Sequence, residues 1–334
     1  MRQVHLDHVA WLEWSSPRGE FHGFGKQISE ALGARPNATL ADGGHPFDVE
    51  LGRLPPGRSG CPFHSHSAQW ELYIILSGIG RVRYGSESRE IRAGDVALHP
   101  PGEPHQLINT GEQELTYYLV ADNPLTEFWH YPDDEKWGHR PGGAIFRRTP
   151  VPYWNDGDDA EEERPVQIET KPTSPRSRFV RLEDIPWNHR RSPRGRFESF
   201  CRDVSLALGG LRNRGVSQGG HPFDVQFRRV APGASICPYH YHVAQWELFV
   251  ILNGQGTVRS GDERRPVRAG DVLLHPPGDA HQLTADASSE LECLILADNP
   301  PVDLFYYPDS DKWGMRPPDR FFRLTEVGYF DGEE

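Results

Sequence analysis

The stretch GRSGCPFHSHSAQWELYIILSG, residues 57–78, decides how the rest of this sequence is interpreted. It places His64 and His66 one residue apart and puts Glu71 five residues further on, where a run of β-forming residues begins. Side chains two positions apart in a strand point to the same face, so the two imidazoles converge on one side. A buried carboxylate without a partner is costly, and imidazoles with a carboxylate are ligands for a divalent metal. The stretch therefore predicts most of a metal site.

The whole pattern occurs a second time, 176 positions later, which is the difference between His64 and His240. With this shift the two halves align without insertion or deletion, and GGHPFDV recurs at 43–49 and 219–225. The period is far longer than that of a solenoid repeat, so each copy is expected to be a whole domain with its own core. We expect an N-terminal domain over residues 1–155 and a C-terminal domain over residues 178–334.

Residues 156–177 separate the two copies and have no counterpart in the repeat. They form an acidic run followed by Pro, Thr and Ser. Such a composition cannot bury enough apolar surface to order itself, which predicts an exposed linker.

The composition predicts an all-β fold. The chain has 34 glycines and 30 prolines, many of them in turns between short runs of Val, Ile, Leu, Tyr and Phe. Strands of the first copy are expected at 47–54, 70–76, 80–84, 95–99, 106–109 and 115–121, and short helical turns at 26–32 and, in the second copy, 202–208. Strands of this length and spacing favour a small antiparallel barrel or jelly roll in each domain.

A second motif, GDVALHPPGEPHQLIN at residues 94–109, contributes a further histidine. His105 follows a Pro-Pro-Gly turn, so the chain reverses direction just before it and can return the ring to the barrel interior. The two motifs together resemble those of the cupin superfamily. The matching residues are His64, His66, Glu71, Gly78, Gly94, Pro100, Gly102, His105 and Asn109, and in the second copy His240, His242, Glu247, Gly254, Gly270, Pro276, Gly278 and His281.

Two departures accompany the resemblance. The glycine before the first histidine pair is shifted by one position, and Ala285 stands where the first copy has Asn109. Neither departure removes a ligand. The resemblance covers nearly the whole chain apart from the linker.

The resemblance implies a bicupin, with two tandem double-stranded β-helix (jelly-roll) barrels. Each barrel would hold one divalent transition metal (Fe, Mn, Zn, Ni or Cu) through three histidines and one glutamate. The implied ligands are His64, His66, Glu71 and His105 in the first barrel and His240, His242, Glu247 and His281 in the second. Four protein ligands leave about two positions of an octahedral ion for substrate or dioxygen.

Residues beside the glutamates are further candidates. Counting by two from Glu71 places Gln69 and Tyr73 on the metal face, and Gln245 and Phe249 take the same places beside Glu247. Each glutamine either orients a bound ligand or fixes the glutamate by hydrogen bonding. Because a hydroxyl enters only one of the two pockets, the sites need not do the same work. The candidate catalytic residues are Glu71, Glu247, Gln69, Gln245 and Tyr73.

Other repeated residues admit two interpretations. Four histidines, His45, His221, His99 and His275, are either acid–base candidates or structural residues bonded to the backbone. Cys61 and Cys237 lie at odd spacing from the histidine pairs, so they are expected to face away from the metal. Trp70 and Trp246 are expected to pack on the opposite face, between the barrels. The YPD-x-x-KWG segments at 131–138 and 307–314 favour a clamp, with a lid or an oligomer contact as alternatives.

Bulk properties exclude several classes of partner. The net charge of −12 argues against nucleic acid, because phosphate contacts need a basic face. No apolar run approaches the roughly 18 residues of a membrane span. Four cysteines at uneven spacing do not form a disulfide framework, and the first residues lack a secretory signal. We expect a cytoplasmic protein that binds a small molecule and is compatible with homo-oligomer formation.

Three functions remain open. The preferred one is a metal-dependent oxidoreductase of the dioxygenase type acting on a small organic molecule, because similar bicupins are known as oxalate decarboxylases and flavonol dioxygenases. The second is a redox-neutral isomerase or decarboxylase in which the ion acts as a Lewis acid. The third is a non-catalytic protein that binds or senses a small ligand.

Overall fold

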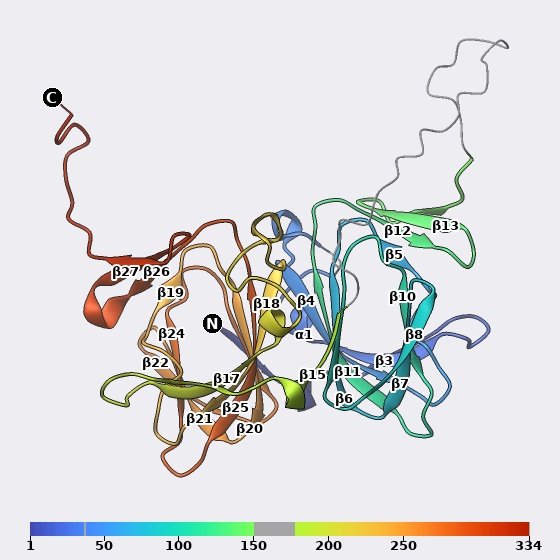
Figure 1. Cartoon of the computed structure of the whole chain (residues 1–334), viewed down its shortest axis with the longest axis horizontal. Helices are drawn as coiled ribbons and strands as arrows, with labels where there is room; N and C mark the ends of the chain where they lie inside the picture. Colours follow the sequence, from blue (N-terminus) through green and yellow to red (C-terminus); the bar gives the residue numbers. More distant parts are fainter. Residues whose placement is uncertain (37, 150–177, 334) are drawn as a thin grey trace.

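The computed structural model describes residues 1–36, 38–149 and 178–333. Two β-barrels lie side by side, and the N-terminus lies in the barrel that the second half of the chain builds (Figure 1). All strand pairs between the named strands of the described residues are antiparallel. The all-β prediction with two jelly-roll barrels is confirmed. The expected linker lies outside the described residues.

The first barrel consists of a seven-stranded and a three-stranded sheet. The order of the large sheet is β15 (Arg178–Arg181), β9 (Asp95–His99), β6 (Glu71–Ser77), β11 (Leu115–Asp122), β4 (Phe47–Leu54), β3 (His22–Gln27) and β2 (Leu12–Ser15). The small sheet is β10 (His105–Asn109), β7 (Ile79–Tyr84) and β8 (Glu87–Arg92). Alternate residues of these strands, such as Tyr73, Val82 and Leu107, form one buried cluster between the sheets.

The second barrel repeats this topology. Its large sheet is β1 (Arg2–His5), β23 (Asp271–His275), β20 (Glu247–Asn253), β25 (Leu291–Asp298), β18 (Phe223–Val230), β17 (Glu198–Asp203) and β16 (Asn188–Arg191). Its small sheet is β22 (Glu263–Arg268), β21 (Gln255–Ser260) and β24 (His281–Ala285).

The first strand of each half belongs to the sheet of the other half. β1 pairs with β23, with Val4 opposite Val272, and β15 pairs with β9, with Val180 opposite Val96. Each exchanged strand is also tied back to its own half, since the Arg2 guanidinium donates to the Leu32 carbonyl at 2.7 Å. Arg178 does the same to Leu208. The two barrels are therefore interlocked by backbone pairing.

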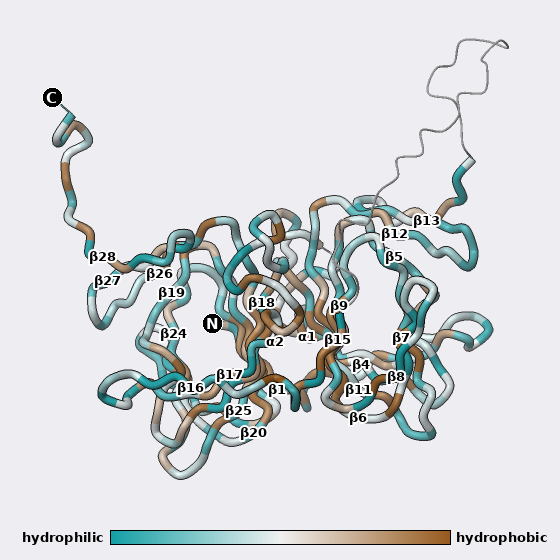
Figure 2. The backbone as a smooth tube through the Cα atoms, viewed as in Figure 1, coloured by the Kyte–Doolittle hydropathy of each residue, from teal (hydrophilic) through white to brown (hydrophobic). Residues whose placement is uncertain are grey.

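The outer faces of the two large sheets share one apolar core. The cluster runs from Leu72 and Val120 of the first barrel to Leu248 and Leu296 of the second, and the hydrophobic stretches gather where the barrels meet (Figure 2). Trp70 and Trp246 lie in or against this cluster, as expected.

Two of the histidine candidates also lie between the barrels. Trp70 packs on His221, with ring centroids 5.4 Å apart, and Trp246 packs on His45 at 5.2 Å. This placement between the barrels favours a structural role for His45 and His221, through packing on tryptophan rings.

The predicted strands of the first copy are all present, with ends that differ by about one residue. The strand β8 was not predicted because its burial pattern is nearly all exposed, as expected of an outer edge. The helical turns are shorter than expected, α1 (Ile28–Ala31) and α2 (Val204–Ala207), because β3 and β17 continue to the residue before each of them. Short 3₁₀ turns are η1 (Leu6–His8), η2 (Leu40–Asp42), η3 (Leu182–Asp184), η4 (Val216–Gln218) and η5 (Pro308–Ser310).

The YPD-x-x-KWG segments are hairpins of their own barrels, which corrects the preferred clamp. The first hairpin, β12 (Glu127–Tyr131) and β13 (Lys136–Arg140), lies between β5 (Ser65–His66) and β14 (Ile145–Phe146). The second, β26 (Asp303–Tyr307) and β27 (Lys312–Arg316), lies between β19 (Tyr241–His242) and β28 (Arg320–Phe322). Each hairpin thus pairs with the strand that carries a predicted metal ligand. Within the described residues, no helix has the length and apolarity needed to cross a membrane.

Candidate metal centres and their cavities

The first group of predicted ligands converges inside the first barrel. His64 and His105 form a two-way backbone bridge, with N···O distances of 3.1 and 2.7 Å. β5 supplies His66, and Glu71 opens β6. One ligand atom from each of the four residues lies within 4.8 Å of the others, so they form a candidate metal-binding group.

The second group is arranged in the same way in the second barrel. His240, His242 and Glu247 have ligand atoms within 4.8 Å of one another. His281 lies beside them, with Nε2 2.9 Å from Oε2 of Glu247. Each barrel thus carries one candidate site.

Backbone carbonyls fix the orientation of four of the ligand rings. Nδ1 of His64 lies 2.9 Å from the Pro62 carbonyl, and Nδ1 of His105 lies 3.2 Å from that of Glu103. His240 and His281 repeat these contacts at 2.9 and 3.0 Å. A carbonyl oxygen only accepts, so each Nδ1 carries the proton and Nε2 keeps its lone pair for the centre of the group.

Two carboxylates orient the remaining two histidines. These carboxylates were not identified from the sequence. Nδ1 of His242 lies 2.6 Å from Oδ2 of Asp303, and Nδ1 of His66 lies 3.3 Å from Oε1 of Glu127. Glu127 is fully buried and accepts backbone N–H bonds from residues 67–69 at 2.8–2.9 Å. Glu127 and Asp303 correspond under the 176-residue shift. An acidic residue at the same position of both halves could have identified them from the sequence.

The side chains of Glu71 and Glu247 are ionised. Burial by itself raises the pKa of Glu71, but the neighbouring imidazoles of His105 and His66 outweigh it and hold the pKa well below its usual range. The pKa of Glu247 is held low in the same way by His242 and His281. The Tyr73 hydroxyl donates to Oε2 of Glu71 at 2.9 Å, whereas Phe249 has no such donor. The expected difference between the two sites is therefore present.

The residues present fit a divalent transition metal. Nε2 of His66 is buried 3.4 Å from Oε1 of Glu71, yet it forms no hydrogen bond with any described residue. Such an unpartnered nitrogen among three other donor atoms is costly unless a cation takes its lone pair. Imidazole nitrogens with one carboxylate oxygen suit Zn, Fe, Mn, Ni or Cu.

His99 and His275 support the ligand rings from behind. His99 stacks on His105 at 4.2 Å between centroids, and His275 stacks on His281 at 3.9 Å. Burial and the neighbouring His281 lower the pKa of His275 to about 3, and neither ring lines the cavities that adjoin Glu71 and Glu247. They pack as neutral rings, which favours their structural interpretation.

Both cysteines lie closer to the ligands than expected. Sγ of Cys61 is 3.5 Å from Nδ1 of His64, and Sγ of Cys237 is 3.6 Å from Nδ1 of His240. Cys237 also lines the second cavity. The prediction that these side chains turn away from the sites is wrong for Cys237, because the chain between it and His240 is not a regular strand. Cys61 contacts the nitrogen of His64 that faces away from the centre of the group.

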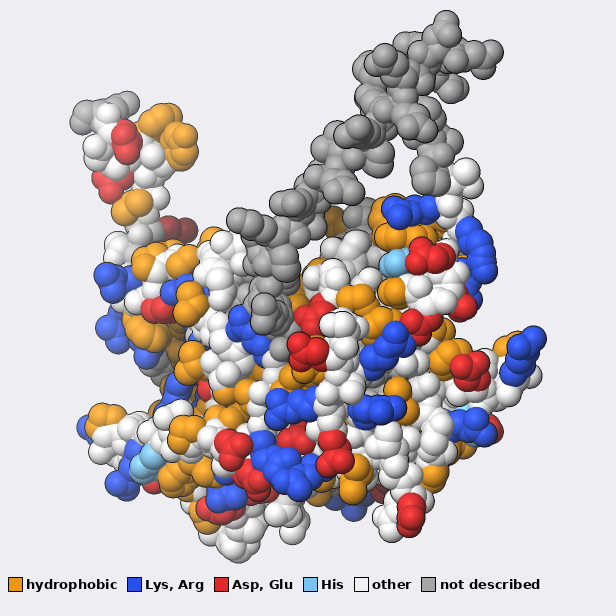
Figure 3. All heavy atoms as spheres, turned by 45° about the vertical axis from the view of Figure 1, so that its right-hand side comes forward, with side chains coloured by type: hydrophobic (Ala, Val, Ile, Leu, Met, Phe, Trp, Pro, Cys, Tyr) orange, Lys and Arg blue, Asp and Glu red, His pale blue; other side chains and the backbone are white. Residues whose placement is uncertain are grey.

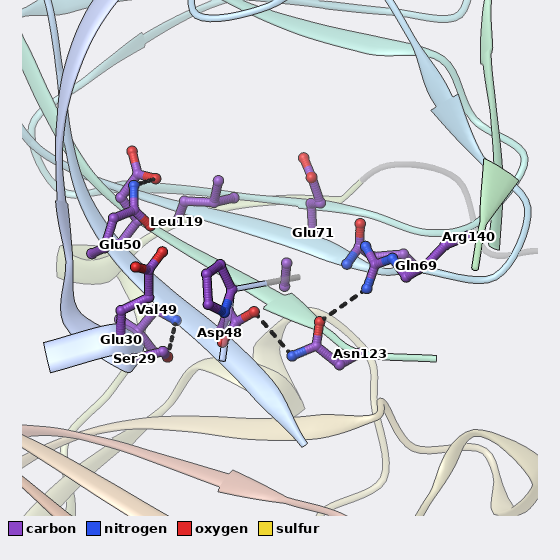
Figure 4. Close-up of a pocket in the computed structure, with 13 residues that line it drawn as sticks. Ser29, Glu30, Asp48, Val49, Glu50, Gln69, Glu71, Leu119, Asn123 and Arg140 are labelled. Atoms are coloured by element: carbon purple, nitrogen blue, oxygen red, sulfur yellow. Dashed lines mark hydrogen bonds between the residues drawn. The ribbon is translucent and has the colours of Figure 1, made fainter. Parts of the chain in front are cut away.

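A small cavity adjoins each candidate group, of about 180 Å³ in the first barrel and about 200 Å³ in the second. Glu71 alone of the first group lines the first cavity, whereas three ligands line the second, His240, His242 and Glu247. In the first cavity Glu30 and Glu50 lie on one side of Glu71, and Gln69 and Arg140 lie on the other (Figure 4). Gln69 and Gln245 each donate their amide N–H to a main-chain carbonyl at 2.6 Å, that of Asp122 or Asp298. The main chain thus fixes both glutamine side chains at the cavity wall.

Comparison with known proteins gives two matches to one family. The cupin domain family matches residues 50–121 and 226–297, which contain all four predicted ligands of each half. The oxalate-binding protein of Thermotoga maritima is 38% identical over 68 residues, 20% of this chain and 55% of that protein. Auxin-binding protein 1 of Arabidopsis thaliana is 29% identical over 125 residues, 35% of this chain and 60% of that protein. The chain thus spans between half and two thirds of these relatives.

Solved structures resemble the chain over most of its length. Oxalate decarboxylase from Lactobacillus farciminis has a TM-score of 0.55 at 14% identity and covers 90% of this chain and 86% of its own. Salicylate 1,2-dioxygenase from Pseudaminobacter salicylatoxidans has a TM-score of 0.52 at 16% identity, with 87% and 76% covered. At such identities the likeness shows the fold alone.

Proposed function

Because the chain belongs to the cupin family and carries two cupin domains, we propose that it is a metal-dependent oxidoreductase of the dioxygenase type acting on a small organic molecule. The observation that supports the proposal is the pair of three-histidine, one-glutamate groups, with His281 joined to the second through Glu247. A cavity adjoins each group, lined by Glu71 in the first barrel and by His240, His242 and Glu247 in the second. His64, His66, Glu71 and His105 would hold one metal, and His240, His242, Glu247 and His281 the other.

When bound, a divalent transition metal supplies Lewis acidity and, for iron, manganese or copper, redox chemistry toward dioxygen. The protein residues supply orientation and protons. Gln69 and Gln245, held by main-chain carbonyls, would position a ligand in each cavity. Tyr73 holds a proton 2.9 Å from Oε2 of Glu71, at the position where the second site has Phe249 and no hydroxyl.

Metal content and oxygen uptake test this proposal together. Purified protein is expected to contain two metal ions per chain and to consume dioxygen with an organic substrate. The double variants His64→Ala/His66→Ala and His240→Ala/His242→Ala should each lose one ion. His8→Ala changes an exposed histidine outside both cavities and serves as the control.

Two results would contradict it in different ways. A metal-free protein after growth with added metals would remove the basis for any metal-dependent activity. Turnover of an organic acid by the metal-loaded protein without oxygen uptake would replace the dioxygenase by a redox-neutral decarboxylase or isomerase.

A further inference from the structure

The two cavities have opposite charge although the same elements build them. The first is lined by four carboxylates, Glu30, Asp48, Glu50 and Glu71, against one guanidinium, a formal charge of −3. The second is lined by two carboxylates, Asp224 and Glu247, against four guanidinium groups, a formal charge of +2. On the face drawn in Figure 3, acidic and basic side chains are interspersed.

Three of the four arginines have no basic counterpart in the first half. Arg190, Arg212 and Arg228 correspond to Trp14, Pro36 and Gly52, whereas Arg316 corresponds to Arg140.

The difference between Gly52 and Arg228 is accompanied by a second difference at a neighbouring position. A Cβ atom on Gly52 would clash with the ring of Tyr117, and the residue that corresponds to Tyr117 is Cys293. An aromatic ring in the first barrel thus occupies space that the second barrel leaves to the Arg228 side chain. The second cavity is built around its guanidinium groups.

Arg228 is a buried cation with no anionic partner. It is only 7% exposed, and it donates to Oε1 of Gln226 at 2.9 and 3.1 Å and to Oγ of Ser199 at 3.1 Å. No carboxylate lies within ion-pair distance of it among the described residues. A buried charge held by neutral groups is unfavourable unless a ligand of opposite charge completes the site.

Two more arginines increase this excess of positive charge. Nε of Arg212 is buried without a hydrogen bond to any described residue, and it lies 3.6 Å from Oδ2 of Asp203. Burial and the charges of Arg190 and Arg228 lower the pKa of Arg212 below its ordinary value. Burial and Arg228 lower the pKa of Arg190 in the same way. An anion in the cavity would relieve this repulsion.

We propose that the second cavity binds a small organic carboxylate through Arg228 and Arg212, beside the candidate metal group, and that the first cavity does not bind it. A planar guanidinium donates two parallel N–H bonds to a carboxylate, which matches the donors that these arginines leave unused. The volume of about 200 Å³ limits the ligand to a small acid. This assignment deepens the proposed function, on which it rests for the metal beside the anion.

Calorimetric titration of the full chain tests the assignment directly. The probes are acetate, malonate and benzoate, with inorganic phosphate and neutral acetamide for comparison. At least one carboxylate should bind with a stoichiometry of one per chain. Arg228→Gln and Arg212→Gln should each weaken that binding roughly thirtyfold or more, because each removes a charged donor that lines the cavity.

Two control variants separate the site from general charge effects. Arg229→Gln changes the next residue of β18, whose side chain points to the opposite face and pairs with Glu292. Arg140→Gln changes the arginine of the first cavity. Both should leave carboxylate binding unchanged within about twofold. Without ligand, Arg228→Gln should melt no lower than the parent chain. Added carboxylate should raise the melting temperature of the parent chain and of both control variants but not that of Arg228→Gln.

Each contrary outcome has a definite meaning. Binding of two carboxylates per chain, or equal loss in Arg140→Gln, overturns the asymmetry between the cavities. Tighter binding of phosphate overturns the carboxylate assignment, and binding that Arg228→Gln does not weaken overturns the site. Repeating the titration on chelator-treated protein separates this proposal from the proposed function, because the arginine dependence should persist there even if no metal is ever found.

Discussion

Some residues that do not contact the metal site still control the chemistry of the histidines that do. His242 is held by Asp303 at 2.6 Å, and His66 lies 3.3 Å from Glu127. A carboxylate on Nδ1 fixes the ring and raises the basicity of Nε2. Because the His242–Asp303 contact is the shorter of the two, we expect metal binding to depend more strongly on Asp303 than on Glu127.

Asp303→Asn is expected to lower metal affinity of the second site by roughly 10- to 100-fold, because the amide keeps the shape but not the charge. Competition with a chromophoric chelator would measure both sites of the same chain. Asp309→Asn, an exposed residue paired with Arg259, is the control. Unchanged affinity in Asp303→Asn would show that the ring is held without the carboxylate.

At the scale of elements, the exchanged strands decide what can fold alone. β9 lies between β15 and β6, so removal of β15 turns β9 into an open sheet edge. Such an edge is a template for aggregation. The strand that covers it lies beyond residue 155, at which the sequence places the end of the first domain.

A fragment of residues 1–187 is therefore expected to be more stable than a fragment of residues 1–155. The longer fragment contains β15 and can restore its pairing with β9. Urea unfolding followed by circular dichroism should give a higher midpoint for it and less aggregation on gel filtration. Equal midpoints would mean that β15 adds little to the first sheet and would support the domain limit at 155.

Part of the candidate site could be predicted from residues that are close in sequence. The rest depends on how the fold brings distant residues together. His64 and His66 lie two positions apart, so strand periodicity predicts that they share one face. Glu71 follows five residues later, close enough in sequence to belong to the same site. Arg190 and Arg316 line one cavity from positions 126 residues apart, and no local pattern joins them. The exchange of β1 and β15 was equally hidden, because both strands fit either sheet by pattern.

At the scale of the whole molecule, the barrels share a core that contains buried histidines. Burial, together with the charge of Arg2, lowers the pKa of His45 to about 4, and burial with Arg178 does the same for His221. Both are neutral in the folded protein at pH 7. In the unfolded chain they titrate near 6.5.

The free energy of unfolding should therefore fall as the pH drops from about 6.5 to about 4, since only the unfolded chain takes up these protons. Each histidine contributes about 1.4 kcal/mol per unit of pKa difference. Burial raises the pKa of Asp122 and Asp298 to about 7, so these carboxyls take up protons in the folded protein and increase its stability as the pH falls. The effect of the histidines is therefore measured by comparing histidine variants with the parent chain.

The double variant His45→Gln/His221→Gln should lose less stability between pH 7 and pH 4.5 than the parent chain. Urea titrations at several pH values would measure the difference. The exposed His8→Gln serves as the control. Parallel curves for parent and double variant would exclude these histidines as the source of acid sensitivity.

The strand exchange has the geometry of a two-fold dimer whose subunits have been joined end to end. In a dimer of identical single-barrel chains every substitution appears in both sites at once. Within one chain the same interlocked architecture carries two independent copies of each position. Gly52 and Arg228 can therefore differ while the pairing of β1 and β15 keeps both barrels together, which leaves one molecule free to hold two unlike chemistries in matched frames.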